Sequence, residues 1–415
     1  MYVDGTPTTS SKIQKQENLL VNNELKRSSP KILYVQYSNP AAYPPLEHSS
    51  RILAEQGWQV FFLGIRGFGG ADLLGFPFHS NIVVRKLPFC PGGWKQKFHY
   101  LWFCIWVMGW TLFWRPRWIY ASDLLSCPLA LLLSFFPFLK VIYHEHDSPF
   151  GSDGSFWRRF CLWTRKKLAH RAKQCVLPDR NRAFYFSGQT GIKNEKVAVV
   201  WNCPAKEEVR EEKRIVHEER LRIYYHGSLG SDRLSLSVLR AMAMFPDSIE
   251  LSVVWYETMD AEAYLQEFKS TAAQLGVEHR IHIRNALSRR YQLMAHAQHY
   301  DVGLAMVSRN TDNINLRHSA CTSNKVFDYL ACGMAVLVSD LPDWRKIYVA
   351  SGYGLACNPE DPKSIVDALQ WFLDHPREMR EMGERGRQRI SAEWNYEQQF
   401  KPVLEMICKY ERVNL

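Results

Sequence analysis

Short apolar runs alternate with amphipathic segments along most of the chain. Runs rich in β-branched and aromatic residues predict strands, and apolar positions spaced three or four apart predict helices. In the first half the expected strands are 32–37, 60–63, 82–87, 118–122, 141–144, 174–177 and 197–200. The expected helices there are 46–56, 98–114, 126–135 and 156–172. This alternation predicts parallel sheets with helices on both faces, an α/β class.

A stretch with a charge at nearly every position follows, and then the alternation starts again. The strands expected in the second half are 222–226, 251–255, 281–284, 302–306, 335–338 and 353–356. The helices expected there are 234–245, 259–274, 288–297, 324–332, 362–375, 377–391 and 396–410. The predicted organisation is a flexible tail (1–30), an N-terminal domain (31–205), a linker (206–220), a C-terminal domain (221–392) and a closing helical segment (393–415) that packs back towards the N-terminal domain.

Composition supports a globular chain and adds an asymmetry of charge. The 415 residues are 46% hydrophobic and 23% charged, which excludes a disordered protein and suits two or three domains. Through Val200 there are 25 basic and 12 acidic residues, whereas the rest of the chain has 27 and 30. An electropositive first half indicates an acidic partner on that side of the molecule.

The ten cysteines are scattered, and no two lie closer than eleven residues. This spacing excludes C-x-x-C zinc sites and a compact disulfide framework, and it favours free thiols in a reducing compartment. Residues 1–30 are polar and contain no apolar stretch, so we expect no secretory signal. A cytoplasmic location is the resulting expectation.

An uncharged aromatic segment, 98–114, is flanked by Lys95, Lys97, Arg115 and Arg117. Its seventeen residues are short for a helix that crosses a bilayer, which needs about 20. Its Trp and Phe rings with flanking cations suit a helix at a membrane surface, and a helix buried in the core has the same composition. The sequence leaves these two interpretations open.

The segment 322–340 (TSNKVFDYLACGMAVLVSD) predicts a phosphate site. Ser323 and Asn324 are good N-cap residues, so the helix that follows presents free backbone N–H groups and the positive end of its dipole. Lys325 adds a cation in the first turn, and a phosphate fits there. Asp328, one turn later, can reach the hydroxyls of a sugar attached to that phosphate.

The same residues resemble a known family. The run from Lys325 to Pro342 follows K-x-x-[E/D]-Y-L-A-x-G-x-x-V-x-x-S-D-x-P, which looks like the donor-site signature of family-4 retaining glycosyltransferases. Further similar segments lie in the order that this family has, and together they cover about 31–410: 142–147, 196–204, 225–229, 288–306, 352–354, 361–369 and 393–395. The resemblance implies the GT-B fold, in which two Rossmann-like β/α/β domains face each other across a cleft.

The resemblance also implies roles for particular residues. Asp328 takes the place of a glutamate that binds the nucleotide ribose, and Arg233 and Lys325 fall at or beside cations that contact the diphosphate. His146 lies where the family has a histidine at the acceptor side, so His146, Arg233 and Lys325 are the expected catalytic residues. The expected donor-binding residues are Gly227, Ser228, Ser323, Asn324, Lys325 and Asp328.

Three departures from the family pattern concern how the sugar is bound. Ala320 stands where the family's E-x7-E motif has its first acid, and Ser228 stands where an arginine is usual. The proline-rich stretch 37–46 replaces the N-terminal glycine-rich loop, and it offers fewer backbone donors.

Two other clusters carry chemistry. The predicted helix 156–172 holds cations interleaved with aromatic residues. This composition suits either a solvated face or contact with anionic lipid or a lipid-phosphate acceptor. The expected acceptor-side or membrane-side cations are Arg158, Arg159, Arg165, Lys166 and Lys167. No nucleic-acid-reading fold accompanies them, so no nucleic-acid partner is expected. In 144–147 (HEHD) two histidines share one face, but no third ligand has suitable spacing. We therefore expect no metal and no other cofactor.

Together the motifs predict a glycosyltransferase that moves a sugar from a nucleotide-diphosphate donor to an acceptor hydroxyl, with retention and without metal. The expected partners are a nucleotide sugar and a glycan or lipid-linked acceptor at the inner membrane face, as in polysaccharide biosynthesis, with an anionic membrane surface nearby. Ala320 and Ser228 leave a second hypothesis open, a non-catalytic protein that binds sugar nucleotides or glycans. A third is a soluble enzyme for a small-molecule acceptor.

Overall fold

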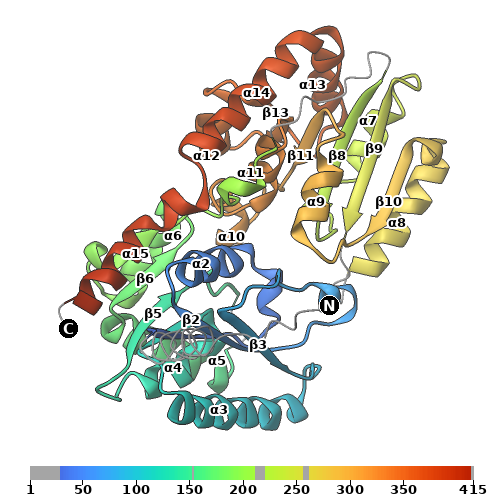
Figure 1. Ribbon diagram of the computed structural model, residues 1–415. Coiled ribbons are helices and arrows are strands. Elements are labelled where there is room, and N and C mark those ends of the chain that lie inside the picture. The colour runs from blue at the N-terminus through green and yellow to red at the C-terminus, as the bar shows by residue number, and fades with distance from the viewer. Residues whose placement is uncertain (1–28, 152–153, 211–219, 256–260, 413–415) are drawn as a thin grey trace, which may run out of the picture.

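Two parallel sheets, one from each half of the chain, form the framework of the protein (Figure 1). The computed structural model describes residues 29–151, 154–210, 220–255 and 261–412. One sheet has the strand order β3-β2-β1-β4-β5-β6-β7 and the other β10-β9-β8-β11-β12-β13. The predicted α/β class with two Rossmann-like sheets is confirmed. Residues 1–28 of the expected tail and 211–219 of the expected linker lie outside the described residues.

All strands expected from the hydrophobic runs are present, with bounds that differ by a residue or two. The strands are β1 (Lys31–Val35), β2 (Gln59–Ile65), β3 (Ile82–Leu87), β4 (Trp118–Ser122), β5 (Lys140–His144), β6 (Gln174–Leu177), β7 (Val197–Val199), β8 (Leu221–Gly227), β9 (Ile249–Trp255), β10 (Ile281–Asn285), β11 (Val302–Ala305), β12 (Ala335–Ser339) and β13 (Gly354–Cys357). Most of their side chains are buried, because helices cover both faces of each sheet.

The helices agree less closely with the expectation. They are α2 (Pro44–Glu55), α3 (Trp94–Trp114), α4 (Cys127–Leu133), α5 (Phe156–Arg171), α6 (Arg180–Thr190), α7 (Ser237–Met242), α8 (Ala261–Gln274), α9 (Arg290–Ala297), α10 (Ile314–Arg317), α11 (Asn324–Ala331), α12 (Pro342–Trp344), α13 (Pro362–Asp374), α14 (Pro376–Ala392) and α15 (Tyr396–Arg412). Helices α6, α10 and α12 were not expected. Helix α6 has little apolar periodicity, but Asp179 caps its start by accepting hydrogen bonds from two backbone N–H groups.

The last helix, α15, belongs to the core of the N-terminal half. Tyr396, Phe400, Val403 and Ile407 are fully buried and pack in one cluster with side chains of β1, β2 and β4. Figure 1 shows α15 descending from the C-terminal half to lie along the N-terminal sheet beside α2. The chain therefore crosses between the halves twice, once near Pro204 and once near Trp394.

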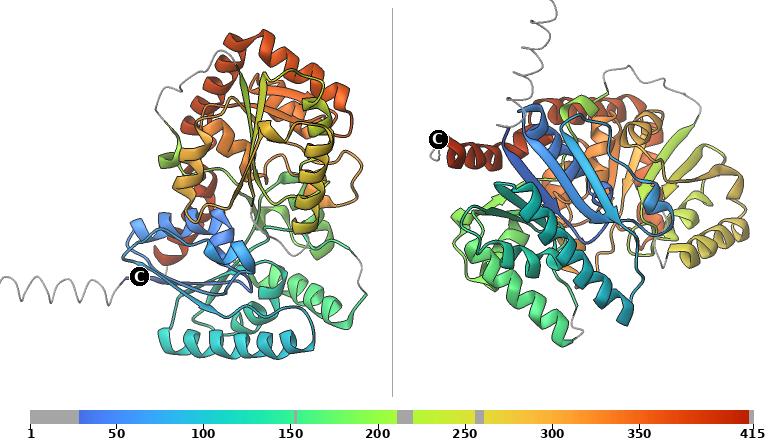
Figure 2. Two further views of the ribbon diagram at one scale, coloured as in Figure 1. Left: turned by 90° about the vertical axis from the view of Figure 1, so that its right-hand side faces the viewer. Right: turned by 60° about the horizontal axis from the view of Figure 1, so that its bottom comes forward.

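Helix α3 covers the far side of the N-terminal sheet from the C-terminal half (Figure 2). One face, with Tyr100, Phe103, Val107 and Thr111, is buried against the sheet. The opposite face is exposed although it is apolar. None of the helices in the described part of the chain has both the length and the apolar character needed to cross a bilayer.

The two halves touch along one edge through specific contacts. The Asn315 side chain accepts a hydrogen bond from the Ser148 backbone N–H (2.8 Å) and donates one to the Ser148 carbonyl (2.9 Å). Asn181 of α6 donates to the Asp343 carboxylate (3.1 Å). These contacts bring the loops at the carboxyl ends of both sheets together, which is where parallel α/β sheets bind ligands.

Candidate functional site

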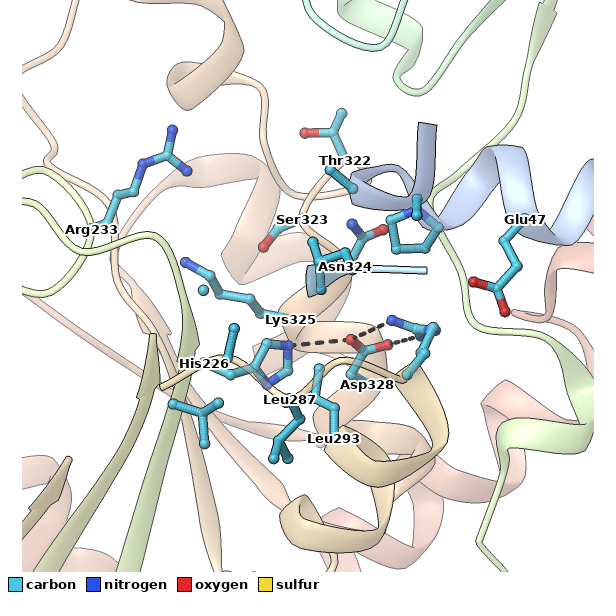
Figure 3. Close-up of a pocket in the computed structure, with 18 of the residues that line it drawn as sticks. Glu47, His226, Arg233, Leu287, Leu293, Thr322, Ser323, Asn324, Lys325 and Asp328 are labelled. Atoms are coloured by element: carbon cyan, nitrogen blue, oxygen red, sulfur yellow. Dashed lines mark hydrogen bonds and ion pairs between the residues drawn. The ribbon is translucent and has the colours of Figure 1, made fainter. Parts of the chain in front are cut away.

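A cavity of 260 Å³ lies between the two halves of the molecule. Loops and helix starts of the N-terminal half supply one wall, including Ala42, Glu47 and Asp147. The C-terminal half supplies most of the rest, including residues at the end of β8 and at the start of α11 (Figure 3). The cavity is thus built from both sheets, and neither half encloses it alone.

The start of α11 opens into this cavity. Ser323 is the N-cap residue in extended conformation, and its side chain makes no capping hydrogen bond. Ser323, Asn324 and Lys325 all line the cavity. The buried Asn324 Oδ1 has no hydrogen-bond partner. The first backbone N–H groups of a helix have no partner within it, so this end is electropositive and suited to an anion.

Lys325 is held at the cavity wall by a tyrosine. Its Nζ donates to the Tyr225 hydroxyl (2.9 Å) and lies 4.4 Å from the centre of that ring. The Tyr225 hydroxyl in turn donates to the Ser228 carbonyl (2.5 Å). Among the described residues no carboxylate lies within ion-pair distance of Lys325. Burial, with a smaller contribution from Arg233, lowers the pKa of Lys325 to about 7.

Gly227 makes room for this lysine. A Cβ atom at Gly227 would lie 2.5 Å from Lys325 Cε, and the glycine has a φ of +129°, which L side chains rarely adopt. The end of β8 and the first turn of α11 can therefore approach closely only because residue 227 is glycine.

A buried ion network forms part of the cavity floor. Asp328 is fully buried and contacts the Arg290 guanidinium through both carboxylate oxygens, while His226 Nε2 lies 3.2 Å from its Oδ2. On its other side, Arg290 Nε lies 2.6 Å from Glu208 Oε1. Glu208 also accepts a hydrogen bond from the Ala205 backbone N–H (2.8 Å) and lies 3.0 Å from His48 Nε2.

Burial alone would raise the pKa values of the two acids, but Arg290 more than compensates. The pKa of Asp328 is held below its ordinary value by Arg290 and His226, and the pKa of Glu208 by Arg290 and His48. Burial lowers the pKa of His226, so its neutral ring donates the Nε2 proton to Asp328. The network joins α11, α9 and the segment η5 (Lys206–Glu208) between the two halves.

Comparison with known proteins matches part of the chain to a sequence family and its fold to solved structures. A sequence-family model described as "Glycosyl transferase-like" matches residues 254–405, which contain α11 and Asp328. Several solved glycosyltransferases have the same two-sheet architecture. The chain has the GT-B fold and carries a glycosyl transferase-like domain. Comparison with curated protein sequences gives no match.

The solved structures that resemble the chain cover nearly all of it. Sucrose-phosphate synthase from Thermosynechococcus elongatus has a TM-score of 0.71 at 14% identity, over 92% of this chain and 99% of that one. HepE of Anabaena, solved with UDP and glucose, has a TM-score of 0.68 at 14% identity, over 92% and 100%. WaaG, a glycosyltransferase involved in lipopolysaccharide biosynthesis, has 0.61 at 12% identity, over 89% and 98%.

In the GT-B cavity, the residues expected at the donor side come together. Gly227, Arg233, Ser323, Asn324, Lys325 and Asp328 all line it. Figure 3 shows Arg233 and Lys325 extending into the same part of the cavity. Arg233 is half-buried and has only a 4.0 Å contact with Asp232. Ser228 is not among the lining residues; its carbonyl accepts the hydrogen bond from Tyr225.

His146 lies behind the cavity wall and is not among the lining residues. Its ring is buried between Tyr43 (5.0 Å between ring centres) and His144 (3.8 Å), and neither ring nitrogen has a hydrogen-bond partner. Burial lowers the pKa of His146 to about 3, so the ring is neutral. The neighbouring Asp147 is the residue of this loop that reaches the cavity.

The cations of α5 have different surroundings. Arg159, Lys166 and Lys167 are exposed, and Arg158 donates to the Phe150 and Gly151 carbonyls. The expectation for Arg165 is wrong, because this side chain is only 3% exposed and forms a bidentate ion pair with Glu145. A helix facing a sheet edge has a buried side, and Arg165 lies on it.

The side chains of 144–147, considered above as a metal site, make contacts within the protein instead. His144 Nδ1 lies 2.8 Å from the Tyr120 hydroxyl, and Glu145 pairs with Arg165. Within the described residues, no three His, Cys, Asp or Glu side chains are grouped so that they could hold a metal ion.

Two charged lining residues were missed by the sequence interpretation. Arg290 and Glu47 both face the cavity, and burial raises the pKa of Glu47. Arg290 lies in the segment 288–306 that resembles the family, but only its contacts in space distinguish it from the neighbouring arginine. Glu47 lies in the first turn of α2, where an acid is ordinarily explained by the helix dipole.

Replacing Gly227 with alanine should displace Lys325 while leaving the protein folded, because the lysine tail is flexible. The ammonium would leave its partly buried position, and its pKa should rise from about 7 towards the ordinary 10.5. A pH titration of ¹³C-labelled lysine Cε resonances measures this shift. Gly109→Ala on α3, where nothing lies within 4 Å of the added Cβ, is the matched control. An unchanged titration near pH 7 in Gly227→Ala would contradict the steric argument.

Replacing Arg290 with methionine should cost about 3–5 kcal/mol of stability at pH 7, because two buried carboxylates lose their counter-charge. The cost should shrink as the pH falls through about 4. Asp328 and Glu208 have ordinary pKa values of 3.8 and 4.5 and depressed ones when folded, so their stabilising contribution is present above that range and is lost below it. Urea titrations from pH 7 to pH 2 measure the difference, because the contribution declines from about pH 4.5 down to the depressed pKa values of the folded protein. Arg284→Met, at an exposed arginine of β10, should change stability little at any pH; a pH-independent cost in Arg290→Met would show that the network is not the cause.

Proposed function

We propose that the protein is a glycosyltransferase that uses a nucleotide-diphosphate sugar, with the donor bound by the C-terminal half. The observation that supports the proposal is that Lys325, Arg233 and the start of α11 line the same cavity. Lys325 is bonded there to the Tyr225 hydroxyl, and among the described residues no carboxylate neutralises its charge. A diphosphate supplies the charge that this wall lacks. HepE, which the chain resembles in fold, is solved with UDP, so UDP-sugars are the first donors to test.

The same groups would act on the leaving group. As the bond between the sugar and the diphosphate breaks, negative charge grows on the departing phosphate oxygens. Lys325, Arg233 and the α11 backbone N–H groups stabilise that charge without having to reorganise, which lowers the barrier for the chemical step. These cations suffice for the role, so we propose that transfer is independent of metal.

The acceptor would enter from the N-terminal half, where Ala42, Glu47 and Asp147 line the cavity. By resemblance to the family we propose retention at the anomeric carbon, with the departing phosphate taking the acceptor's proton. His146, neutral and behind the wall, would shape this side by packing against Tyr43 rather than exchange a proton itself. Asp328 would hold the ribose, with Arg290 fixing its carboxylate.

For the acceptor we propose a lipid-linked or polysaccharide glycan at a membrane face. The exposed cations Arg159, Lys166 and Lys167 lie in the acceptor half of the molecule. WaaG, similar in fold, is involved in lipopolysaccharide biosynthesis. This part of the proposal also makes the protein a peripheral membrane enzyme.

Donor binding should take up a proton. In the empty site Lys325 has a pKa of about 7, and an adjacent diphosphate raises it, so between those two values binding converts the neutral amine to the ammonium. At pH 8 we expect uptake of close to one proton per UDP, and affinity that falls as the pH rises above 7. Isothermal titration calorimetry in buffers with different ionisation enthalpies measures the uptake. Lys325→Gln should abolish it; equal uptake in both proteins would assign the proton to another group.

The test of function is sugar transfer with purified protein, a panel of nucleotide sugars and membrane-extracted glycolipid acceptors, with product stereochemistry read by NMR. Lys325→Ala and Arg233→Ala should each lower turnover by about 100-fold or more, and EDTA should change nothing. Arg240→Ala, at an exposed cation of α7, is the control and should retain full turnover. Wild-type turnover in the Lys325→Ala/Arg233→Ala double variant would overturn the assignment. Tight UDP binding without transfer or donor hydrolysis across the panel would favour the non-catalytic alternative.

A further inference from the structure

We infer that the exposed sides of α3 and α5 form one docking face for an anionic bilayer, with α3 lying along the membrane plane. The docking face consists of Trp94, Phe98, Leu101, Trp102, Ile105, Leu112 and Phe113 of α3 and of Phe156, Arg159, Phe160, Trp163, Lys166 and Lys167 of α5. The inference rests on the proposed function only in that a lipid-linked acceptor gives the contact a purpose.

The α3 part of the docking face is an apolar stripe along one side of the helix. Its members lie opposite the buried stripe of Tyr100, Phe103 and Val107, and between Ile105 and Leu112 the same side carries the half-buried Met108 and the exposed Gly109. Phe98 is 66% exposed and Phe113 is 79% exposed. A single exposed apolar residue needs no explanation, but a stripe along a helix of 21 residues does. With about 1.5 Å per residue, the stripe runs for about 30 Å parallel to the helix axis.

Helix α5 extends the docking face and adds charge. Trp157 of α5 packs edge-on against Tyr100 of α3, with ring centres 5.1 Å apart, so the two helices adjoin. Phe156 is 78% exposed and Trp163 is 53% exposed, on the same side as Arg159, Lys166 and Lys167. Aromatic rings beside cations match the boundary between lipid headgroups and acyl chains.

Acidic side chains are few in this part of the chain, and none belongs to the docking face. From Lys86 to His144 the sequence has one acid, Asp123, and that side chain is half-buried with its Oδ1 accepting a hydrogen bond from the His146 backbone N–H (2.8 Å). Helix α5 contains no acid at all, and Glu145 is buried against Arg165. The exposed charge of the docking face is therefore positive throughout the described residues, which is complementary to anionic lipid.

The docking face also connects to the cavity. The loop after β5 supplies Asp147 to the cavity wall, and Ser148 of this loop exchanges two hydrogen bonds with Asn315. Arg158, near the start of α5, donates to the carbonyls of Phe150 (3.0 Å) and Gly151 (2.6 Å). The loop between β5 and α5 thus links the docking face to the cavity wall, and a bilayer against α3, on the far side of the N-terminal sheet, would leave the C-terminal half in water.

Vesicle flotation of the full chain, without donor or acceptor, tests the inference. We expect binding to phosphatidylcholine vesicles that contain 30% phosphatidylglycerol, and at least tenfold weaker binding to pure phosphatidylcholine or in 0.5 M salt. Phe98→Ser/Leu101→Ser/Ile105→Ser and Arg159→Gln/Lys166→Gln/Lys167→Gln should each weaken binding at least tenfold. All six positions are exposed, and circular dichroism together with UDP affinity checks that the variants fold.

The matched control is Arg240→Gln/Lys269→Gln/Lys346→Gln, which removes the same charge from exposed positions of the C-terminal half and should bind like wild type. Equal binding by all these proteins, or no binding of wild type to the anionic vesicles, overturns the inference. A dimer in sedimentation velocity that is lost in the apolar variant, without vesicle binding, would assign the docking face to a second copy and would also overturn it. UDP affinity is measured separately, so a negative result in the vesicle assay does not count against the proposed donor site.

Discussion

The contact of the Arg290 guanidinium with Asp328 and Glu208 organises the centre of this molecule. All three side chains have little or no exposure to water, so each charge has given up hydration that only its partners replace. Asp328 lies on the helix that begins at the donor side of the cavity, and Glu208 lies on the segment that joins the two halves. The ion network therefore couples the position of a candidate ribose ligand to the geometry between the domains.

Lys325, on the same helix as Asp328, has the opposite surroundings. Lys325 has a hydroxyl and an aromatic ring as neighbours but no paired carboxylate in the described structure, and burial works against its charge. A buried charge that is satisfied stabilises the apo protein, whereas one that is under-compensated favours a ligand of opposite sign. Asp328 and Lys325 lie one turn apart on α11 but differ in this respect. Asp328 is paired and belongs to the structural part of the site, whereas Lys325 has no anionic partner in the described structure and is suited to bind an anion.

The sequence predicted the strands because they are buried on both faces, and buried strands produce apolar runs that are easy to recognise. It predicted the donor side of the cavity because Ser323, Asn324 and Lys325 are consecutive at a helix start, so one local motif specifies their geometry. Arg290 and Glu208 are far apart in the chain, and no local pattern indicates that they meet. Arg165 was misplaced because a run of cations does not reveal which member points inwards. In α3 both faces are apolar, so only the fold distinguishes the core face from the exposed one.

Three features of the chain follow from one arrangement: a cationic wall at the start of α11, a second wall from the other half, and an ion network that joins the two halves. The central proposal is that the cationic wall receives a nucleoside diphosphate. A crystal structure of the full chain with UDP tests this most directly. The account predicts the diphosphate at the start of α11 within hydrogen-bond distance of Lys325 Nζ, with the ribose at Asp328. A diphosphate bound elsewhere, with Lys325 still donating to the Tyr225 hydroxyl, would contradict it.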